Sequence, residues 1–136
     1  MILVDTGPLV ALFDPQEAQY AACRQTLASI RLPTVTTLPV LTETFHILGP
    51  ESRGSEALRS FIAEGGMSIH FSSHEETMRA FELMSTYKDH PMDLADASVI
   101  AAAEALATRR VFTLDRNDFE TYRIKRGHRL YPVEII

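Results

Sequence analysis

Short apolar runs alternate with helical patterns along the whole chain, and this alternation is the feature that most restricts its fold. The runs that predict strands fall within residues 2–5, 33–37, 65–71, 110–114 and 130–135. The patterns between them predict helices near residues 8–13, 14–30, 39–48, 55–64, 73–87, 93–107 and 116–122. Alternating strands and helices are typical of an α/β fold, and continuous apolar strands indicate helices on both faces of the sheet. We therefore expect one three-layer domain, residues 1–136, with a central, mostly parallel sheet flanked by helices.

Two short segments contain residues that are typical of a turn or of the start of a helix. Residues 6–8, with the sequence TGP, predict a turn after the first strand. Asp14, Pro15 and Glu17 predict the start of the next helix, with Asp14 as its N-cap and Glu17 completing a capping box.

Length, charge and cysteine content limit the class of protein. At 136 residues the chain suits a single core, and no apolar run reaches the roughly 18 residues of a membrane span. Cys23 is the single cysteine, so an intramolecular disulfide is impossible, which favours a cytoplasmic protein. A net charge of −5 argues against a passive phosphate binder. Residues 109–129 nevertheless carry seven basic and three acidic side chains, so this segment could contact a polyanion.

Two of the predicted strands end in an aspartate. Asp5 follows the apolar residues ILV, and Asp115 follows VFTL. A buried carboxylate is costly unless it is paired or holds a cation. In open α/β sheets, ligands bind at the carboxyl ends of the strands, and neighbouring strands lie about 4.8 Å apart. If these two strands are neighbours, their carboxylates can share a cation.

Acidic residues also fall within two helical patterns, at positions that favour the inward face. Asp96 has apolar residues at i+3 and i+4, and Asp93 lies on the same helix face. Glu43 has Val40 at i−3 and Ile47 at i+4. An acid within an apolar stripe is an informative exception to the usual burial of apolar residues.

Structural roles also explain several of these acids when each is taken singly. Asp93 is a good N-cap with Asp96 at position N3, and Asp115 could cap the short helix that follows it. Asp5 could form a turn, and Glu43 could point to solvent. What favours a joint site is that Asp5, Glu43, Asp96 and Asp115 all fit one edge of one sheet.

Four carboxylates gathered at one edge would repel one another unless a cation lay between them. Oxygen ligands suit Mg²⁺ or Mn²⁺, and the five histidines show no spacing that indicates a zinc site. A cation held by carboxylates is well suited to phosphoryl chemistry. The hydroxyls of Thr6 and Thr113 could orient a carboxylate or a water molecule, although a turn position and a strand position also explain these residues.

The segments VDTGPLVALFD, LTET, MDLADASVIAAAE and TLDRNDF together resemble the PIN domain, in particular the bacterial VapC-type ribonuclease toxins. The match covers essentially the whole chain in order, and its specificity comes from the set of segments. The resemblance implies a Mg²⁺- or Mn²⁺-dependent endoribonuclease, a hydrolase that cleaves RNA phosphodiester bonds. It also implies that the protein is the toxin of a VapBC-type toxin–antitoxin pair, blocked by a VapB-type antitoxin, and that it forms a homodimer.

The acids of the family pattern fall on matching positions of this chain. The resemblance assigns the acidic, catalytic and metal-binding positions to Asp5, Glu43, Asp96 and Asp115. It implies that Asp5 and Asp96 bind the metal and that the other two complete the cluster, directly or through water. Thr6 matches a Ser/Thr position of the family, and we expect Asp93 and Thr113 to support the site.

The mechanism that follows is an in-line attack on the phosphodiester by a water molecule that the metal activates, with a carboxylate as base. We expect RNA to approach partly through residues 109–129, with Arg116 contacting a phosphate beside Asp115.

Three other functions fit the sequence less well than a metal-dependent ribonuclease. A phosphatase of the haloacid-dehalogenase type needs a D-x-D motif, but position 7 is Gly7. A flap-type or DNA-directed nuclease is usually larger than this chain. A catalytically silent PIN-fold module that binds RNA or protein is the main alternative, and the intact set of acids argues against it.

Overall fold

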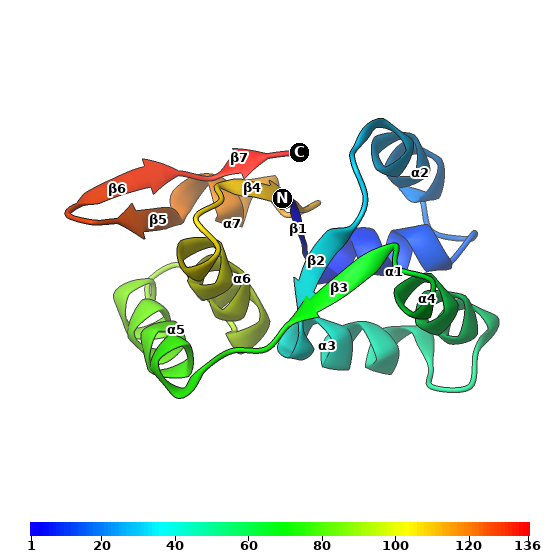
Figure 1. Cartoon of the computed structure of the whole chain (residues 1–136), viewed down its shortest axis with the longest axis horizontal. Coiled ribbons are helices and arrows are strands. Elements are labelled where there is room, and N and C mark those ends of the chain that lie inside the picture. Colours follow the sequence, from blue (N-terminus) through cyan, green and yellow to red (C-terminus); the bar gives the residue numbers. More distant parts are fainter.

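The computed structural model describes all 136 residues and contains one central sheet with helices on both sides (Figure 1). In chain order the elements are β1 (Leu3–Val4), α1 (Thr6–Phe13), α2 (Tyr20–Ser29), β2 (Thr34–Thr37), α3 (Leu38–Leu48), α4 (Arg53–Ala63), β3 (Met67–His70), α5 (His74–Thr86), α6 (Leu94–Ala105), β4 (Arg110–Phe112), α7 (Arg116–Thr121), β5 (Arg123–Arg126), β6 (Arg129–Pro132) and β7 (Glu134–Ile135). None of these helices is both long and apolar enough to cross a membrane.

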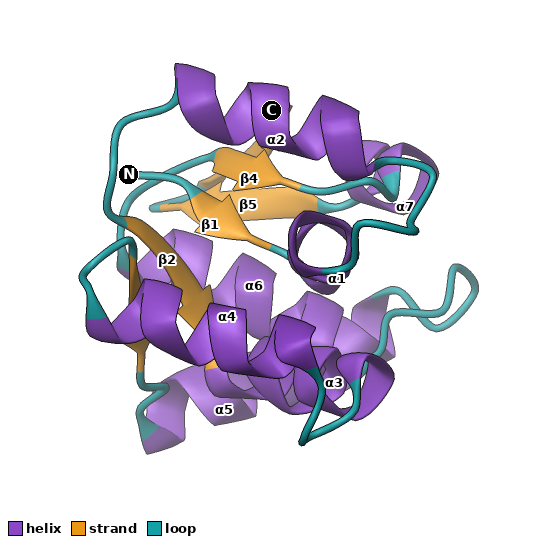
Figure 2. Ribbon diagram, turned by 90° about the vertical axis from the view of Figure 1, so that its right-hand side faces the viewer, coloured by secondary structure: helices purple, strands orange, loops and turns teal.

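The central sheet has five strands in the order β3-β2-β1-β4-β7, and every neighbouring pair is parallel. In the middle of the sheet, Leu3 of β1 lies opposite Val35 of β2 on one side and Val111 of β4 on the other. Helices α5 and α6 lie on one side of the sheet, and α1, α2 and α4 lie on the other (Figures 1 and 2). The predicted three-layer α/β fold with a parallel sheet is confirmed.

Helix α6 forms the centre of the core. Residues 97–103 are all buried, and Val99 and Ile100 are fully inaccessible to solvent. Alanines at most of the other buried positions let the helix approach β1 and β2 closely, because no long side chain holds the backbones apart. The N-terminus of α6 is thereby fixed at the carboxyl ends of these strands.

The first helices begin at other residues than the sequence predicts. Residues 6–8 form the first turn of α1, where Pro8 fits because its missing N–H is not needed there. The predicted N-cap role of Asp14 is wrong, since α2 begins only at Tyr20. The Asp14 carboxylate instead accepts a hydrogen bond of 3.0 Å from the N–H of Gln16, two residues on, and so closes a local turn.

The C-terminal part contains more strands than the one expected near residues 130–135. Strands β5 and β6 form a separate antiparallel hairpin, and Gly127 takes a positive φ of 62° in its tight turn. Strand β7 then joins the edge of the main sheet beside β4. Charged residues obscure β5 in the sequence, but its buried Ile124 shows the alternation of a half-buried strand.

Helix α4 lies very close to the end of α1 at Gly54, and this contact gives a test of the packing. A Cβ atom added at Gly54 would overlap the carbonyl oxygen of Phe13. Alanine normally stabilises a helix relative to glycine, but here we expect Gly54→Ala to destabilise the protein by about 1–3 kcal/mol. Thermal unfolding measures the effect, with Ser60→Ala on the exposed side of α4 as the control. An unchanged or raised melting temperature for Gly54→Ala would contradict this packing.

Candidate functional site

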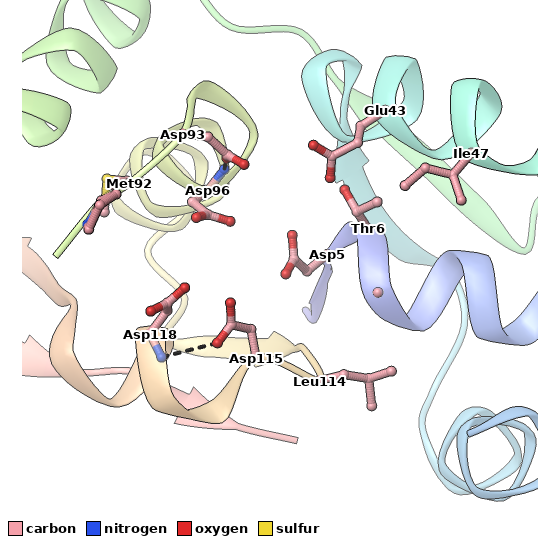
Figure 3. Close-up of a pocket in the computed structure, with 12 residues that line it drawn as sticks. Asp5, Thr6, Glu43, Ile47, Met92, Asp93, Asp96, Leu114, Asp115 and Asp118 are labelled. Carbon is pink, nitrogen blue, oxygen red and sulfur yellow. Dashed lines mark hydrogen bonds between the residues drawn. The ribbon is translucent and has the colours of Figure 1, made fainter. Parts of the chain in front are cut away.

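An open pocket of about 810 Å³ lies at the carboxyl ends of β1 and β4, among α1, α3, α6 and α7 (Figure 3). No lysine or arginine lines it. Six carboxylate side chains line it: Asp5, Glu43, Asp93, Asp96, Asp115 and Asp118. The four predicted acids therefore do come together at one edge of the sheet, as the sequence indicates.

Asp5 is held at the end of β1 by backbone and side-chain contacts. Its N–H donates to the carbonyl oxygen of Phe112 at 3.0 Å, which continues the pairing of β1 with β4. Asp5 is the N-cap of α1, but its carboxylate makes no capping bond and accepts one from the hydroxyl of Thr113 at 2.9 Å. Burial raises the pKa of Asp5 to about 6, and the charges of Asp93 and Glu43 add to the rise.

Asp96 lies in the first turn of α6, facing Asp5 across the pocket (Figure 3). Burial is the main cause that raises the pKa of Asp96 to about 8, and the charges of Asp93 and Asp5 contribute to this rise. The fully buried Tyr122 donates a hydrogen bond of 3.3 Å to its carboxylate. Near neutral pH the cation-free site therefore favours the protonated form of Asp96.

Asp93 combines the two roles that the sequence left open. It is the N-cap of α6, and its Oδ1 accepts the N–H of Asp96 at 2.8 Å. Its carboxylate also lines the pocket, so the same side chain fixes the start of the helix and adds negative charge to the site.

Glu43 extends from α3 toward Asp5 and Thr6 (Figure 3). It is half-buried, and Val40 beside it is fully buried, as expected. Ile47, however, is 55% exposed and lines the pocket, so the predicted inward stripe around Glu43 is wrong on this side. Glu43 reaches the site because it lies at the boundary between the buried face of α3 and the open pocket.

Asp115 and Asp118 both enter the pocket from α7 (Figure 3). Asp115 caps the helix, since its Oδ1 accepts the N–H of Asp118 at 3.2 Å. Partial burial raises the pKa of Asp115, and contacts with Asp118 contribute to the shift. Asp118 is absent from the sequence-based site, although its three-residue spacing from Asp115 repeats the spacing of Asp93 and Asp96 and could have indicated it.

Asp118 also has a partner from another segment. The Nε2 atom of His90, in the loop before α6, lies 2.5 Å from its Oδ1, at ion-pair distance. The two groups form no hydrogen bond, so the contact is an ion pair only when the imidazole is protonated. His90 thereby ties α7 to the loop that leads into α6.

The two threonines differ in what they contact. Thr113 bridges two acids, because its hydroxyl donates to Asp5 and accepts the N–H of Asp115 at 3.0 Å. Thr6 lies in the pocket wall with its hydroxyl oxygen buried and without any hydrogen-bond partner in the protein. A polar atom in this state is suited to a water molecule or ligand that enters the pocket.

Arg116 is not brought into the acidic pocket. Its side chain is exposed and lines a different hollow, on the far side of Leu114. A contact between Arg116 and RNA would therefore lie beside the acidic pocket and not within it. This contact stays a prediction.

The donor chemistry of this pocket fits a hard divalent cation. All of the candidate ligands are oxygen atoms, no lysine or arginine lines the pocket, and one wall carries an unpartnered hydroxyl. No three acidic, histidine or cysteine side chains converge closely enough to hold one ion directly. Mg²⁺ does not require three converging side chains, because it usually keeps several water ligands and takes one or two carboxylates from the protein.

The raised pKa of Asp96 gives the cation-free protein a pH-dependent stability. The folded protein retains a proton that the unfolded chain loses between about pH 4 and about pH 8, so stability falls as the pH rises through this range. We expect Asp96→Asn to raise the melting temperature by about 5 °C near pH 9 and by much less near pH 5. Thermal unfolding in a chelator measures this, with the exposed Asp89→Asn as the control. An equal effect at both pH values would contradict the raised pKa of Asp96.

Comparisons with known proteins identify the family and the fold that this chain shares. A family model described as the PIN domain matches residues 2–125. Ribonuclease VapC26 of Mycobacterium tuberculosis is 27% identical over 125 residues, which cover 90% of this chain and 92% of that protein. The crystal structure of M. tuberculosis VapC20, a Sarcin-Ricin loop cleaving toxin, superposes with a TM-score of 0.79 at 18% identity, over 87% of this chain and 92% of the other.

A toxin–antitoxin complex from Klebsiella pneumoniae gives a TM-score of 0.70 at 21% identity, over 89% of this chain and 92% of the other. At these identities the two structural matches show a shared fold. The predicted resemblance is confirmed by the family model, which spans nearly the whole sequence. The chain belongs to the PIN domain family.

Proposed function

We propose that this protein is a VapC-type endoribonuclease that hydrolyses RNA phosphodiester bonds with the help of Mg²⁺ or Mn²⁺. The observation that carries the proposal is the pocket of six carboxylates with no basic side chain in its wall. Carboxylates gathered in this way repel one another and lower the stability of the fold, and a bound cation would offset that repulsion. The names of the relatives support the substrate class, since one is a ribonuclease and another cleaves the Sarcin-Ricin loop.

The residues that would hold the cation are Asp5 and Asp96, with Glu43 and Asp115 completing the cluster directly or through water. A divalent cation supplies there the positive charge that activates a water molecule and stabilises the charge developing on a phosphate. Thr113 keeps the Asp5 carboxylate turned toward the pocket by its hydrogen bond of 2.9 Å. Tyr122 holds Asp96 in the same way, and burial raises the pKa of this tyrosine, so its hydroxyl stays a donor.

Replacing either central aspartate tests the assignment. We expect Asp5→Asn and Asp96→Asn each to lower metal-dependent RNA cleavage by about 100-fold or more, because each removes a negative ligand without changing side-chain size. Cleavage of a labelled RNA is followed with Mg²⁺ or Mn²⁺ and with a chelator, and thermal unfolding shows whether the variants remain folded. Glu120→Gln, an exposed acid of α7 outside the pocket, is the control. Full cleavage by both aspartate variants would rule out the proposed site.

Cation binding should release protons from the same carboxylates. With the pKa of Asp96 near 8 and that of Asp5 near 6, we expect the affinity for Mn²⁺ to rise about 100-fold between about pH 6 and about pH 8. Isothermal titration calorimetry in buffers of different ionisation enthalpy measures both the affinity and the protons released. In Asp96→Asn most of this pH dependence should disappear. An affinity that does not change with pH would contradict the assignment of these two ligands.

The alternative is a PIN-fold module that binds RNA or protein without catalysis. Such a module should show no Mn²⁺ binding that depends on Asp5 or Asp96. The unpartnered hydroxyl of Thr6 and the raised pKa values favour a site that accepts a ligand. The Mn²⁺ titration therefore separates the two functions even when no suitable RNA is known.

We also propose a VapB-type antitoxin as the protein partner, with support from the fold shared with a toxin of a toxin–antitoxin complex. A segment that carries an arginine or lysine into the acidic pocket would complement its charge and block it. A homodimer and a cytoplasmic location are further proposals. The buried, unpaired Cys23 fits the second of these, since no disulfide is needed for this fold.

A further inference from the structure

The basic residues of segment 109–129 do not form one continuous surface. Arg109 and Arg110 lie at the amino end of β4, opposite to the acidic pocket. The Nε of Arg109 donates to the carbonyl oxygen of Pro132 at 3.0 Å, and its guanidinium stacks over Tyr131. Arg110 lies 3.7 Å from the carboxylate of Glu134. Both residues thus stabilise the C-terminal strands.

The bases of the β5–β6 hairpin are also remote from the pocket. The N–H of Lys125 donates to the carboxylate of Glu104 at 2.7 Å, near the C-terminal end of α6, whereas the pocket lies at its N-terminal end. Arg126 and Arg129 face each other across the hairpin, which extends away from the sheet (Figure 1). Arg123 donates to carbonyl groups at the end of α7. Arg116 is the remaining base of the segment, and it lies at the carboxyl end of the sheet.

Arg116 lines a second hollow of about 400 Å³ that lies next to the acidic pocket. The two cavities share Leu114, which is 41% exposed and forms the ridge between them. Gln19 and Thr26 of the α2 region also line this hollow, and none of its lining side chains is acidic. Arg116 makes no ion pair within 4.0 Å, although two carboxylates of α7 are near it in sequence. Its charge is therefore available to an anion.

On the basis of the ribonuclease function above, we propose that this hollow binds a phosphate group of the RNA strand next to the one that is cleaved. The planar guanidinium of Arg116 donates two parallel hydrogen bonds to phosphate oxygens, which is the geometry that arginine favours. The side-chain amide of Gln19 adds a further donor. Because one residue separates the two cavities, an extended strand that crosses Leu114 occupies both with successive nucleotides.

Loss of the Arg116 charge tests this subsite through binding alone. The Asp96→Asn protein, which we expect to be inactive, is titrated into a fluorescein-labelled single-stranded RNA, and the dissociation constant is measured by anisotropy over a range of salt concentrations. Adding Arg116→Gln should weaken binding about fivefold and reduce the slope of log affinity against log salt by about 0.7. Arg126→Gln removes the same charge from the hairpin and should change affinity less than about twofold. Equal effects of the two substitutions would overturn the proposal.

Filling the hollow gives a second test that leaves the net charge unchanged. Ala22 and Ala21 are both exposed on α2, but only Ala22 lines the hollow. We expect Ala22→Trp to weaken RNA binding in the same background and Ala21→Trp to leave it unchanged. Equal binding by the two tryptophan variants would count against an occupied hollow.

Different experimental results would overturn the phosphate subsite and the ribonuclease function. Cleavage by the protein with its natural site residues tests the function, and the Arg116→Gln substitution in that protein should raise KM with little effect on kcat. Normal cleavage with equal effects of Arg116→Gln and Arg126→Gln overturns the subsite and leaves the nuclease in place. Absence of cleavage, together with a selective loss of RNA binding in Arg116→Gln, supports the subsite and removes the hydrolytic function. Absence of any RNA binding overturns both.

Discussion

The parallel pairing of β1 with β4 is the interaction on which the candidate site depends. Val4 lies opposite Phe112, and the N–H of Asp5 donates to the carbonyl of Phe112, so Asp5 comes opposite Thr113. The Thr113 hydroxyl then joins the Asp5 carboxylate to the backbone of Asp115. A slip of one residue in this pairing would turn these side chains to the other face of the sheet. The register of two short strands therefore sets the geometry of half of the acidic cluster.

The remaining acids are placed by helices that are fixed by the core. Helix α6 brings Asp93 and Asp96 to the pocket because its buried alanines pack against β1 and β2. Each of these acids has a contact that fixes it, since Asp93 caps the helix and Tyr122 holds Asp96. None of these contacts offsets the burial of Asp96 and the nearby charges of Asp93 and Asp5, which together raise its pKa. The core thus supports a charge arrangement that lowers stability, and the proposed cation would offset this cost.

The positions of three of the four acids could be predicted because each depends on a local pattern. Asp5 and Asp115 follow apolar runs, and Asp96 precedes a run of alanine and β-branched residues. The start of α2 could not be predicted this way, because the Asp14 side chain satisfies a turn as well as a helix cap. Ile47 is exposed because the pocket opens beside α3. The periodicity of apolar residues within α3 does not reveal this opening.

Neighbours in sequence can also point to different cavities, as α7 shows. Asp115 and Asp118 face the acidic pocket, whereas Arg116 lines the hollow beyond Leu114, because successive residues of a helix project about 100° apart. The hairpin likewise separates bases that the sequence groups into one segment. The total charge of a segment is therefore a poor guide to a binding surface. The direction in which each charged side chain points has to be known from the structure.

The separation of charge across Leu114 has a thermodynamic consequence for the proposed reaction. A phosphate in the hollow is attracted by Arg116, but its neighbour in the strand then lies against carboxylates that repel it. A cation in the acidic pocket converts that repulsion into attraction, so RNA and cation each strengthen the binding of the other. Linkage requires the two effects to be equal in free energy. An arginine or lysine from a partner would compete with the divalent cation for these carboxylates, and it would not supply a metal ion that can activate water.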